Sequence, residues 1–290
     1  MKLLLTGANG QIGHEIKALA KKTGFEVYAF SKAELNITQS MQVKRIFSEV
    51  NPHYIINAAA YTVVDRAETE SEAAFSVNGS GVKYLAEAAR QAGIPLLHIS
   101  TDYVFDGEKK TAYLEEDATN PLSIYGKSKL AGEDFIRQIW YKHIILRVSW
   151  VFGYYGSNFV KTIVQIAKQK YELRIVCDQY GGPTYAIDIA ETLLKIVNAL
   201  QNGCNSWGTY HYSGLPMTNW HQFASCIIET SSCIHSLATK LILPIPASAY
   251  PTLAYRPYNS QLLSNKIERV FNIVPKKWQD GLIEVIERLA

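Results

Sequence analysis

The segment Thr6-Gly7-Ala8-Asn9-Gly10-Gln11-Ile12-Gly13 constrains the fold of this chain more than any other. It follows an apolar run at residues 2–5 and precedes apolar residues that recur at helical spacing up to residue 20. A strand, a glycine-rich turn and a helix, in this order at the start of a chain, form the first unit of a dinucleotide-binding α/β fold.

Each glycine of this turn has a physical role. Gly7 permits the tight turn, Gly10 lets the backbone approach a pyrophosphate, and Gly13 lets helix and strand pack closely. The helix N-terminus then directs its free N–H groups at the anion. We therefore expect a cofactor beside Gly7, Gly10, Gln11, Ile12 and Gly13; the alternative is a tight strand–helix turn that binds nothing.

Short apolar runs alternate with helical patterns over the first half of the chain. We expect strands at residues 2–5, 25–30, 54–57, 96–100 and 143–148, with helices at 12–20, 40–50, 70–92 and from about 125. Strands that are apolar throughout, with helices between them, indicate a parallel sheet covered on both faces. The fold class is therefore α/β, a Rossmann-type doubly wound sheet over residues 1–153.

The pattern changes after Gly153, where loops lengthen and prolines concentrate in a segment, residues 244–257, that we expect to be a loop. The sequence predicts a smaller C-terminal α+β substrate-binding lobe at residues 154–290, with some of its segments extending the sheet. Its expected helices are 159–170, 187–200, 219–230 and 277–289, and its expected strands are 174–176 and 209–212.

Composition excludes several classes of protein. The chain has 290 residues, 48% of them hydrophobic, and a net charge of +3, which gives no electrostatic footprint for a nucleic acid. It has no apolar run long enough for a membrane span and no signal peptide, so we expect a cytoplasmic protein. The four cysteines and seven histidines show no metal-ligand spacing, and we interpret Trp140, Trp207, Trp220 and Trp278 as packing residues.

The end of the second expected strand bears on the choice of cofactor. An acidic residue there would accept the ribose hydroxyls of NAD, whereas a cation would bind the 2′-phosphate of NADP. This chain has Ser31 and Lys32, and no carboxylate before Glu34. The sequence therefore favours NADPH over NADH, although NADH stays possible and Lys32 has an alternative interpretation as a solvated surface lysine.

Tyr125 and Lys129 project from one face of the expected helix because they are four residues apart. A nearby ammonium would lower the pKa of the phenol, and such a tyrosine can donate a proton to a carbonyl oxygen. Thr101, at the end of the fourth expected strand, faces the crevice where ligands bind to parallel sheets. We expect Thr101, Tyr125 and Lys129 to be the catalytic residues.

These motifs carry a family resemblance over essentially the whole chain. The glycine turn, Asn57-Ala58-Ala59-Ala60, the run Ser100-Thr101-Asp102-Tyr103-Val104-Phe105-Asp106-Gly107 and the Tyr125/Lys129 pair resemble the extended short-chain dehydrogenases/reductases. Within that group the chain resembles the dTDP-4-dehydrorhamnose reductase family. Later segments continue the likeness: residues 147–153, Asn158-Phe159-Val160, residues 178–184 and Arg256-Pro257-Tyr258-Asn259-Ser260.

The resemblance implies a role for further residues. Ala58, Ala59, Ala60, Tyr61 and Thr62 would pass the cofactor riboses, and Asn36 and Ile37 would lie beside the adenine, although the family usually has Asp at position 36. Tyr125 would donate the proton, and Lys129 would bind the nicotinamide ribose. The nucleotide-sugar pocket would be lined by Thr62, Val63, Thr101, Asp102, Tyr103, Trp150 and Arg256.

The resemblance also implies an activity, the NADPH-dependent reduction of the C4 carbonyl of a dTDP-4-keto-6-deoxy sugar by a monomer or homodimer. Some relatives bind Mg²⁺ at a dimer interface. Glu15 matches one ligand, but a full set cannot be placed, so Mg²⁺ stays possible and we assign no metal ligands.

Two alternatives stay open: a non-catalytic regulatory subunit of the kind that accompanies methionine adenosyltransferase, and a redox-neutral nucleotide-sugar epimerase or dehydratase. The dehydratases carry Thr-Asp-Glu where this chain has Thr101-Asp102-Tyr103, and a phenol is a poor base near neutrality.

Overall fold

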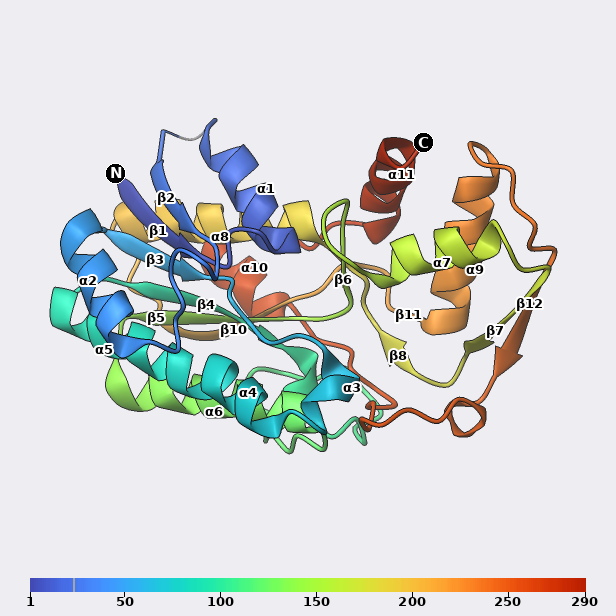
Figure 1. The fold of residues 1–290 in the computed structure, drawn as a ribbon, viewed down its shortest axis with the longest axis horizontal. Coiled ribbons are helices and arrows are strands. Elements are labelled where there is room, and N and C mark those ends of the chain that lie inside the picture. The colour runs from blue at the N-terminus through green and yellow to red at the C-terminus, as the bar shows by residue number, and fades with distance from the viewer. Residues whose placement is uncertain (23) are drawn as a thin grey trace.

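A computed structural model describes residues 1–22 and 24–290 of the chain. Within these residues, six parallel strands form one sheet in the order β10-β5-β4-β3-β1-β2 (Figure 1). This confirms the expected Rossmann-type sheet. The strands are β1 (Lys2–Thr6), β2 (Glu26–Phe30), β3 (Tyr54–Asn57), β4 (Leu96–Thr101), β5 (His143–Val148) and β10 (Gly208–Tyr212).

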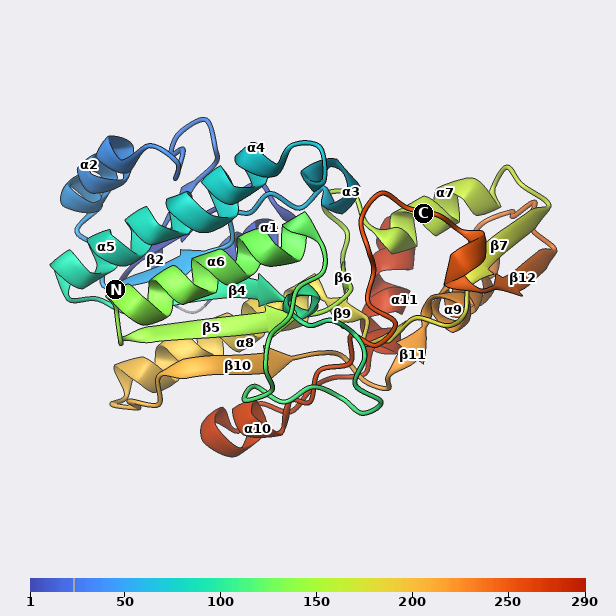
Figure 2. The same ribbon diagram turned by 90° about the horizontal axis from the view of Figure 1, so that it is seen from below.

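Helices cover both faces of the sheet. Side chains on either face of a strand are therefore buried, which explains why the strands are apolar throughout. Leu3 and Leu5 of β1 pack with α1 (Gln11–Ala20) and α8 (Ala186–Gln201). Leu4 points the other way and packs with α2 (Ser40–Val50), α5 (Val82–Ala92) and α6 (Ile124–Ile139). Figure 2 shows α5 and α6 over one face, with α8 on the other.

The last strand of the sheet comes from far along the chain. β10 pairs with β5 in parallel, with His211 opposite Arg147, although it lies well beyond residue 153. The crossover to β10 passes through α8, and α10 (Asn265–Phe271) also packs on this edge. Our predicted strand at residues 209–212 therefore extends the nucleotide-binding sheet.

The helix expected at residues 70–92 is interrupted by a π-helical segment. The order is α4 (Ser71–Phe75), η1 (Ser76–Gly81) and α5, preceded by a short helix α3 (Val64–Ala67) that the sequence does not predict. The wider turn brings the Asn78 side chain to the backbone of Tyr61, with which it exchanges hydrogen bonds of 2.8 and 3.0 Å. π-Bulges of this kind occur at functional sites.

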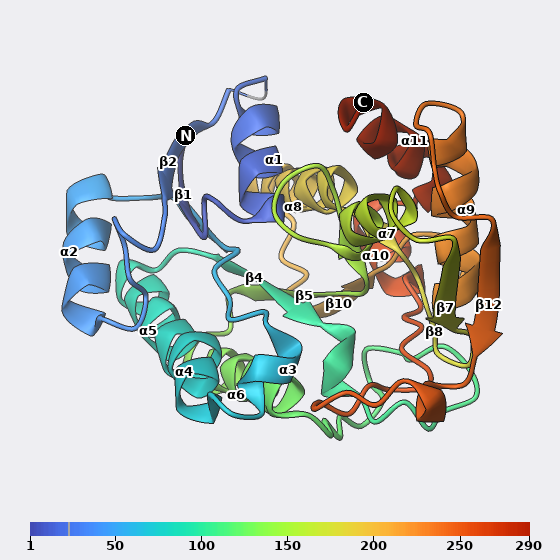
Figure 3. The same ribbon diagram turned by 45° about the vertical axis from the view of Figure 1, so that its right-hand side comes forward.

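The second lobe has its own core beside the carboxyl ends of the strands (Figure 3). Phe152, Phe223 and Trp278 are buried there among α7 (Phe159–Ala167), α9 (Trp220–Ser232) and α11 (Trp278–Arg288). The remaining short elements are β6 (Val151–Phe152), β8 (Tyr180–Gly181), β9 (Thr184–Tyr185), β11 (Thr218–Asn219), η2 (Asp102–Val104) and η3 (Ala247–Ala249). No helix within the described ranges is long and apolar enough to cross a membrane.

Our expectation of a loop at residues 244–257 is wrong at its start. β12 (Leu241–Ile245) pairs in parallel with β7 (Glu172–Val176), and Pro244 lies opposite Ile175. Proline is compatible with this strand because β12 has a partner on one side only, so the missing N–H removes no ladder bond there.

A buried ion pair joins α6 to the sheet. Glu133 of α6 and Arg147 of β5 are almost completely buried, and the guanidinium donates to both carboxylate oxygens, over 3.0 and 2.7 Å. Ser100 of β4 donates to the same carboxylate, and Arg137 pairs with it from the solvent side. Burial alone would raise the pKa of Glu133, but these partners hold that pKa below its usual value.

Arg147→Met would leave the Glu133 carboxylate buried with only Arg137 for charge compensation. We expect the free energy of unfolding, measured by urea denaturation, to fall by about 3–5 kcal/mol. Arg137→Met is the matched control, because Arg137 is about a third exposed (35%) and its loss should cost under about 1 kcal/mol. Equal losses in the two variants would contradict a dominant role for the buried pair.

Candidate active site

A cleft of about 260 Å³ lies over the glycine turn at the carboxyl ends of β1, β2 and β3. Gly7 has φ +70, and a Cβ atom there would lie 2.5 Å from the backbone of Ala58. A Cβ atom on Gly13 would lie 2.2 Å from the Gly7 carbonyl oxygen, so only glycine lets α1 pack this closely. The backbone thus forms the cradle that a pyrophosphate requires beside a helix N-terminus.

Most residues expected to bind the cofactor line this cleft. They are Gly7, Gly10, Lys32, Asn36, Ile37, Ala58, Ala59, Ala60 and Tyr61, joined by Asn9, Leu35 and Val77, which the motifs do not single out.

Four residues that we expected to bind the cofactor do not line this cleft and have other contacts or positions. Gln11 turns toward the second lobe and accepts a hydrogen bond from Asn158 (2.9 Å). The Ser31 N–H donates to the Glu34 carboxylate (2.8 Å). Ile12 and Gly13 lie within α1, behind the turn.

Tyr125 lies at the first turn of α6, beside the end of β4. Ser123 caps this helix by accepting from the Gly126 N–H (3.1 Å), and a Cβ atom on Gly126 would lie 2.2 Å from the Tyr103 carbonyl oxygen. This close approach places Tyr125 beside Thr101, near enough for the threonine hydroxyl to lower the pKa of the phenol. The structure therefore brings together two of the three residues expected to be catalytic.

We expected the Lys129 ammonium to lower the pKa of Tyr125, and this expectation is wrong for this structure. Desolvation raises the pKa of Tyr125 to about 12, an effect that the hydrogen bond with Thr101 only partly offsets. Lys129 does not lower the pKa of Tyr125 because its Nζ points elsewhere. Nζ donates to the Ile99 carbonyl (2.6 Å) and lies 3.2 Å from His98 Nε2. Burial lowers the pKa of Lys129 to about 8.

The residues after Thr101 form a compact hydrogen-bonded turn. The Thr101 hydroxyl donates to Asp102 (2.9 Å) and accepts from the Tyr103 N–H (3.2 Å). Burial raises the pKa of Asp102 to about 6 and also raises that of Tyr103, whose ring lies edge-on to Tyr125 with the centroids 5.6 Å apart. Both aromatic residues are therefore protonated phenols near neutral pH.

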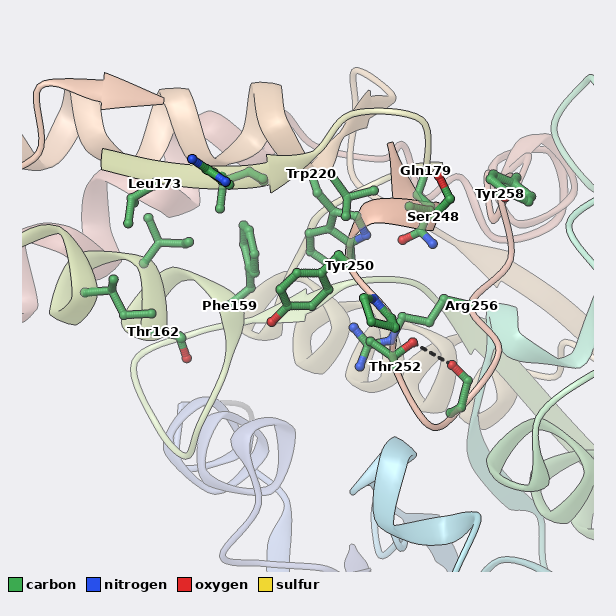
Figure 4. A pocket seen from close by; sticks show the side chains of 18 of the residues that line it. Phe159, Thr162, Leu173, Gln179, Trp220, Ser248, Tyr250, Thr252, Arg256 and Tyr258 are labelled. Atoms are coloured by element: carbon green, nitrogen blue, oxygen red, sulfur yellow. Dashed lines mark hydrogen bonds between the residues drawn. The ribbon is translucent and has the colours of Figure 1, made fainter. Parts of the chain in front are cut away.

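A larger pocket of about 750 Å³ occupies the second lobe (Figure 4). Its walls are α7, β7, α9 and the segment from Ala247 to Tyr258, and the aromatic rings of Phe159, Trp220 and Tyr250 face the space between them. Trp220 is thus more than the packing residue that we expected. Trp150 lies behind it, with the two rings stacked 3.5 Å apart.

Arg256 lines the same pocket and links the two lobes. Its Nη2 pairs with Asp65 of α3 (2.7 Å), and the other oxygen of Asp65 accepts from the Ala254 N–H (3.1 Å). Val63 directly precedes α3 and is half exposed. The contact of Asp65 with Arg256 therefore joins α3 to the segment that lines the pocket.

The described residues do not fit a metal site. Glu15 is buried, with one oxygen lacking a hydrogen-bond partner, and Arg288 is its salt-bridge partner at 3.9 Å. Burial raises the pKa of Glu15, which favours the neutral acid. No group of three or more His, Cys, Asp or Glu side chains that could hold a metal ion occurs in the part of the chain that the structure describes.

Comparison with known proteins agrees with this geometry. The family model described as RmlD substrate binding domain matches residues 1–290. A dTDP-4-dehydrorhamnose reductase of Aggregatibacter actinomycetemcomitans is 46% identical over 284 residues, 97% of each chain.

Solved structures give the same answer. The dTDP-4-dehydrorhamnose reductase of Clostridium acetobutylicum aligns with a TM-score of 0.93 and 37% identity, covering 100% of this chain and 99% of that one. The Bacillus anthracis enzyme, solved in complex with NADP, aligns with a TM-score of 0.90 and 35% identity over 99% of both chains. The chain belongs to the family of the dTDP-4-dehydrorhamnose reductases, as its motifs predict.

Proposed function

We propose that this protein reduces the C4 carbonyl of dTDP-4-dehydro-6-deoxy-L-mannose to give dTDP-L-rhamnose, with NADPH as hydride donor. The observation that carries the proposal is the placement of Tyr125 on Thr101 at the carboxyl end of β4. This is the edge of a doubly wound sheet where ligands bind.

Tyr125 is suited to the role of general acid. With a pKa of about 12 its phenol stays protonated at neutral pH, so a proton is available whenever a carbonyl oxygen binds beside it. NADPH, when bound, supplies the hydride that reaches C4. The proton from Tyr125 goes to O4, which leaves a phenolate. Lys129, four residues along the same helix face, would stabilise this phenolate when it is charged and its Nζ turns from the Ile99 carbonyl toward the phenol.

The residues of the glycine cleft fit NADPH. The close approach of Gly7 and Gly13 to neighbouring backbone leaves the space in front of the α1 N-terminus free for a pyrophosphate. Lys32 lines the cleft at the end of β2, where a 2′-phosphate would lie, and Leu35 and Ile37 offer apolar contacts for an adenine.

The pocket of the second lobe suits the nucleotide of the substrate. Its aromatic rings offer stacking surfaces for a thymine base, and Arg256 offers a charged partner for the diphosphate. The sugar would then lie toward Tyr125, Thr101 and Asp102. The volume of about 750 Å³ is within the range of small-molecule sites.

The comparisons support this reading over a non-catalytic subunit or a redox-neutral enzyme. Incubation with NADPH and dTDP-4-dehydro-6-deoxy-L-mannose, followed through the cofactor absorbance, should show one NADPH oxidised per sugar reduced. Conversion of dTDP-glucose or UDP-glucose by protein that carries tightly bound NAD⁺, with no net change in absorbance, would contradict the reductase assignment.

Tyr125→Phe removes the acid and keeps the ring against Tyr103. We expect kcat to fall at least about 100-fold, the lower end of the usual contribution of general acid catalysis. NADPH affinity, measured by fluorescence titration, should stay the same because the hydroxyl is the only group removed. A variant with near-normal kcat would exclude Tyr125 as the proton donor.

Lys32→Asp replaces a cation of the glycine cleft with an anion. The ratio of kcat/KM for NADPH to that for NADH should drop about tenfold, since one partly desolvated charge contact is worth about this much. Lys44→Asp on α2 makes the same charge change away from the lining residues of the cleft and should leave the ratio unchanged. If both variants behave alike, Lys32 is a surface lysine without a role in cofactor choice.

A further inference from the structure

A chain of buried polar groups runs from the end of β1 to Lys129. Thr6, Asn57, His98 and Lys129 are each at most 2% exposed, and each lies within hydrogen-bond distance of the next. The sequence assigns His98 no function, because the histidines show no metal-ligand spacing. His98 lies between Asn57 and Lys129 and contacts both, so its protonation state bears on that of Lys129.

The orientation of the Asn57 amide is fixed by two donors. The Thr6 hydroxyl donates to its Oδ1 over 2.6 Å, and the Ala59 N–H donates to the same oxygen over 3.1 Å. A backbone N–H can only donate, so this atom of Asn57 is the oxygen. The NH₂ group therefore faces His98, and Nδ2 lies 2.9 Å from His98 Nδ1.

The amide in turn fixes the tautomer of His98. Because Asn57 Nδ2 donates, His98 Nδ1 must be the acceptor and carries no proton. A neutral imidazole then carries its proton on Nε2, and an imidazolium is excluded because both its nitrogens are donors. Complete burial also lowers the pKa of His98 well below its usual value, in the same direction.

The Nε2–H group points at Lys129 Nζ, 3.2 Å away. An ammonium has only donors to offer, so it would oppose this N–H, whereas a neutral amine can accept from it and still donate to the Ile99 carbonyl (2.6 Å). We propose that His98, held by Asn57, is a positioning residue for Lys129: it stabilises the uncharged amine on the Ile99 carbonyl, so charging Lys129 requires the His98–Asn57 bond to break.

The other groups around Lys129 do not explain why its uncharged amine would be favoured. Glu133, one turn further along α6, favours the charged amine, but Arg147 and Arg137 already neutralise it. On β4 the neighbours of Lys129 are His98 and the neutral Ile99 carbonyl, and η1 offers the neutral Asn78, which bonds to Ser128. Within the described residues, His98 is thus the titratable group in direct contact with Lys129 Nζ.

The consequence concerns the pH range of the proposed reduction, on which this inference rests in part. Lys129 stabilises the phenolate of Tyr125 only while it carries a charge. Activity should therefore fall as the pH rises through the pKa of Lys129, which is lowered to about 8. Burial places that limit below the pH at which an ordinary lysine loses its proton, and the His98–Asn57 pair would act in the same direction.

Asn57→Asp reverses the hydrogen bonding with almost no change in shape. A carboxylate cannot donate, so His98 would place its proton on Nδ1 and offer Nε2 as an acceptor to a charged Lys129. We expect the alkaline limit of NADPH-dependent kcat to move up by about one pH unit or more. Thr6→Val is the matched control, since the Ala59 N–H still fixes the amide, and it should leave the limit in place.

The tautomer itself can be measured without turnover. In ¹⁵N-histidine-labelled protein, long-range ¹H–¹⁵N spectra distinguish the two tautomers, and His98→Gln identifies the His98 signals by their loss. We expect the Nε2–H form in the natural protein and in Thr6→Val, and the Nδ1–H form in Asn57→Asp. An Nδ1–H form or an imidazolium in the natural protein would overturn the inference, even if Asn57→Asp failed to fold.

The two measurements separate this inference from the proposed function. Absence of reductase activity in the natural protein, together with an Nε2–H tautomer, would contradict the proposed function and leave the coupling between His98 and Lys129 intact. Reductase activity with an unshifted alkaline limit in Asn57→Asp would contradict the coupling alone.

Discussion

The arrangement of the active site depends on the ion pair between Glu133 and Arg147. Among residues 1–22 and 24–290 it is the ion pair that ties α6 to the interior of the sheet, and Ser100 brings β4 into the same cluster. Ser100 directly precedes Thr101, and Glu133 lies one turn beyond Lys129. The pair therefore fixes the helix that carries Tyr125 and Lys129 against the strand that carries His98 and Thr101.

Desolvation is the second constraint, and it acts on each titratable group of the site in turn. It raises the pKa of Tyr125 and of Asp102, and it lowers the pKa of Lys129. All three shifts favour the uncharged form. Such a site holds a protonated phenol that can donate to a carbonyl oxygen, and it carries little charge of its own.

The sequence predicts the sheet and the glycine cleft well because their signals are local. The glycine spacing, the apolar runs and the helix periodicity all lie within short segments, and the cleft contains nine of the expected residues, from Gly7 to Tyr61. The position of β10 at the edge of the sheet was harder to predict, since it depends on how a distant segment pairs with β5. The π-helical turn at Asn78 has no recognised sequence signal.

Electrostatics at the site could not be derived from spacing alone. The four-residue separation of Tyr125 and Lys129 places both on one helix face, but it does not say where each side chain ends. Lys129 reaches the Ile99 carbonyl and His98 on the neighbouring strand, a contact that depends on the packing of α6 on β4. The pocket of the second lobe was predicted only in part. Arg256 was expected to line a pocket, but most other lining residues were not, because the walls come from segments far apart in the chain.

The ion pair between Asp65 and Arg256 links the lobes through a contact that can be exchanged. Asp65 bonds to Arg256 and to the Ala254 backbone, both of which line the pocket, and both charged side chains are about a third exposed. An exposed pair of this kind contributes about 1 kcal/mol or less, so a diphosphate can replace Asp65 as the partner of Arg256 at small cost. The buried Glu133–Arg147 pair cannot be exchanged in this way. The protein thus keeps a fixed ion pair beneath the helix that carries Tyr125 and an exchangeable one beside the pocket of the second lobe.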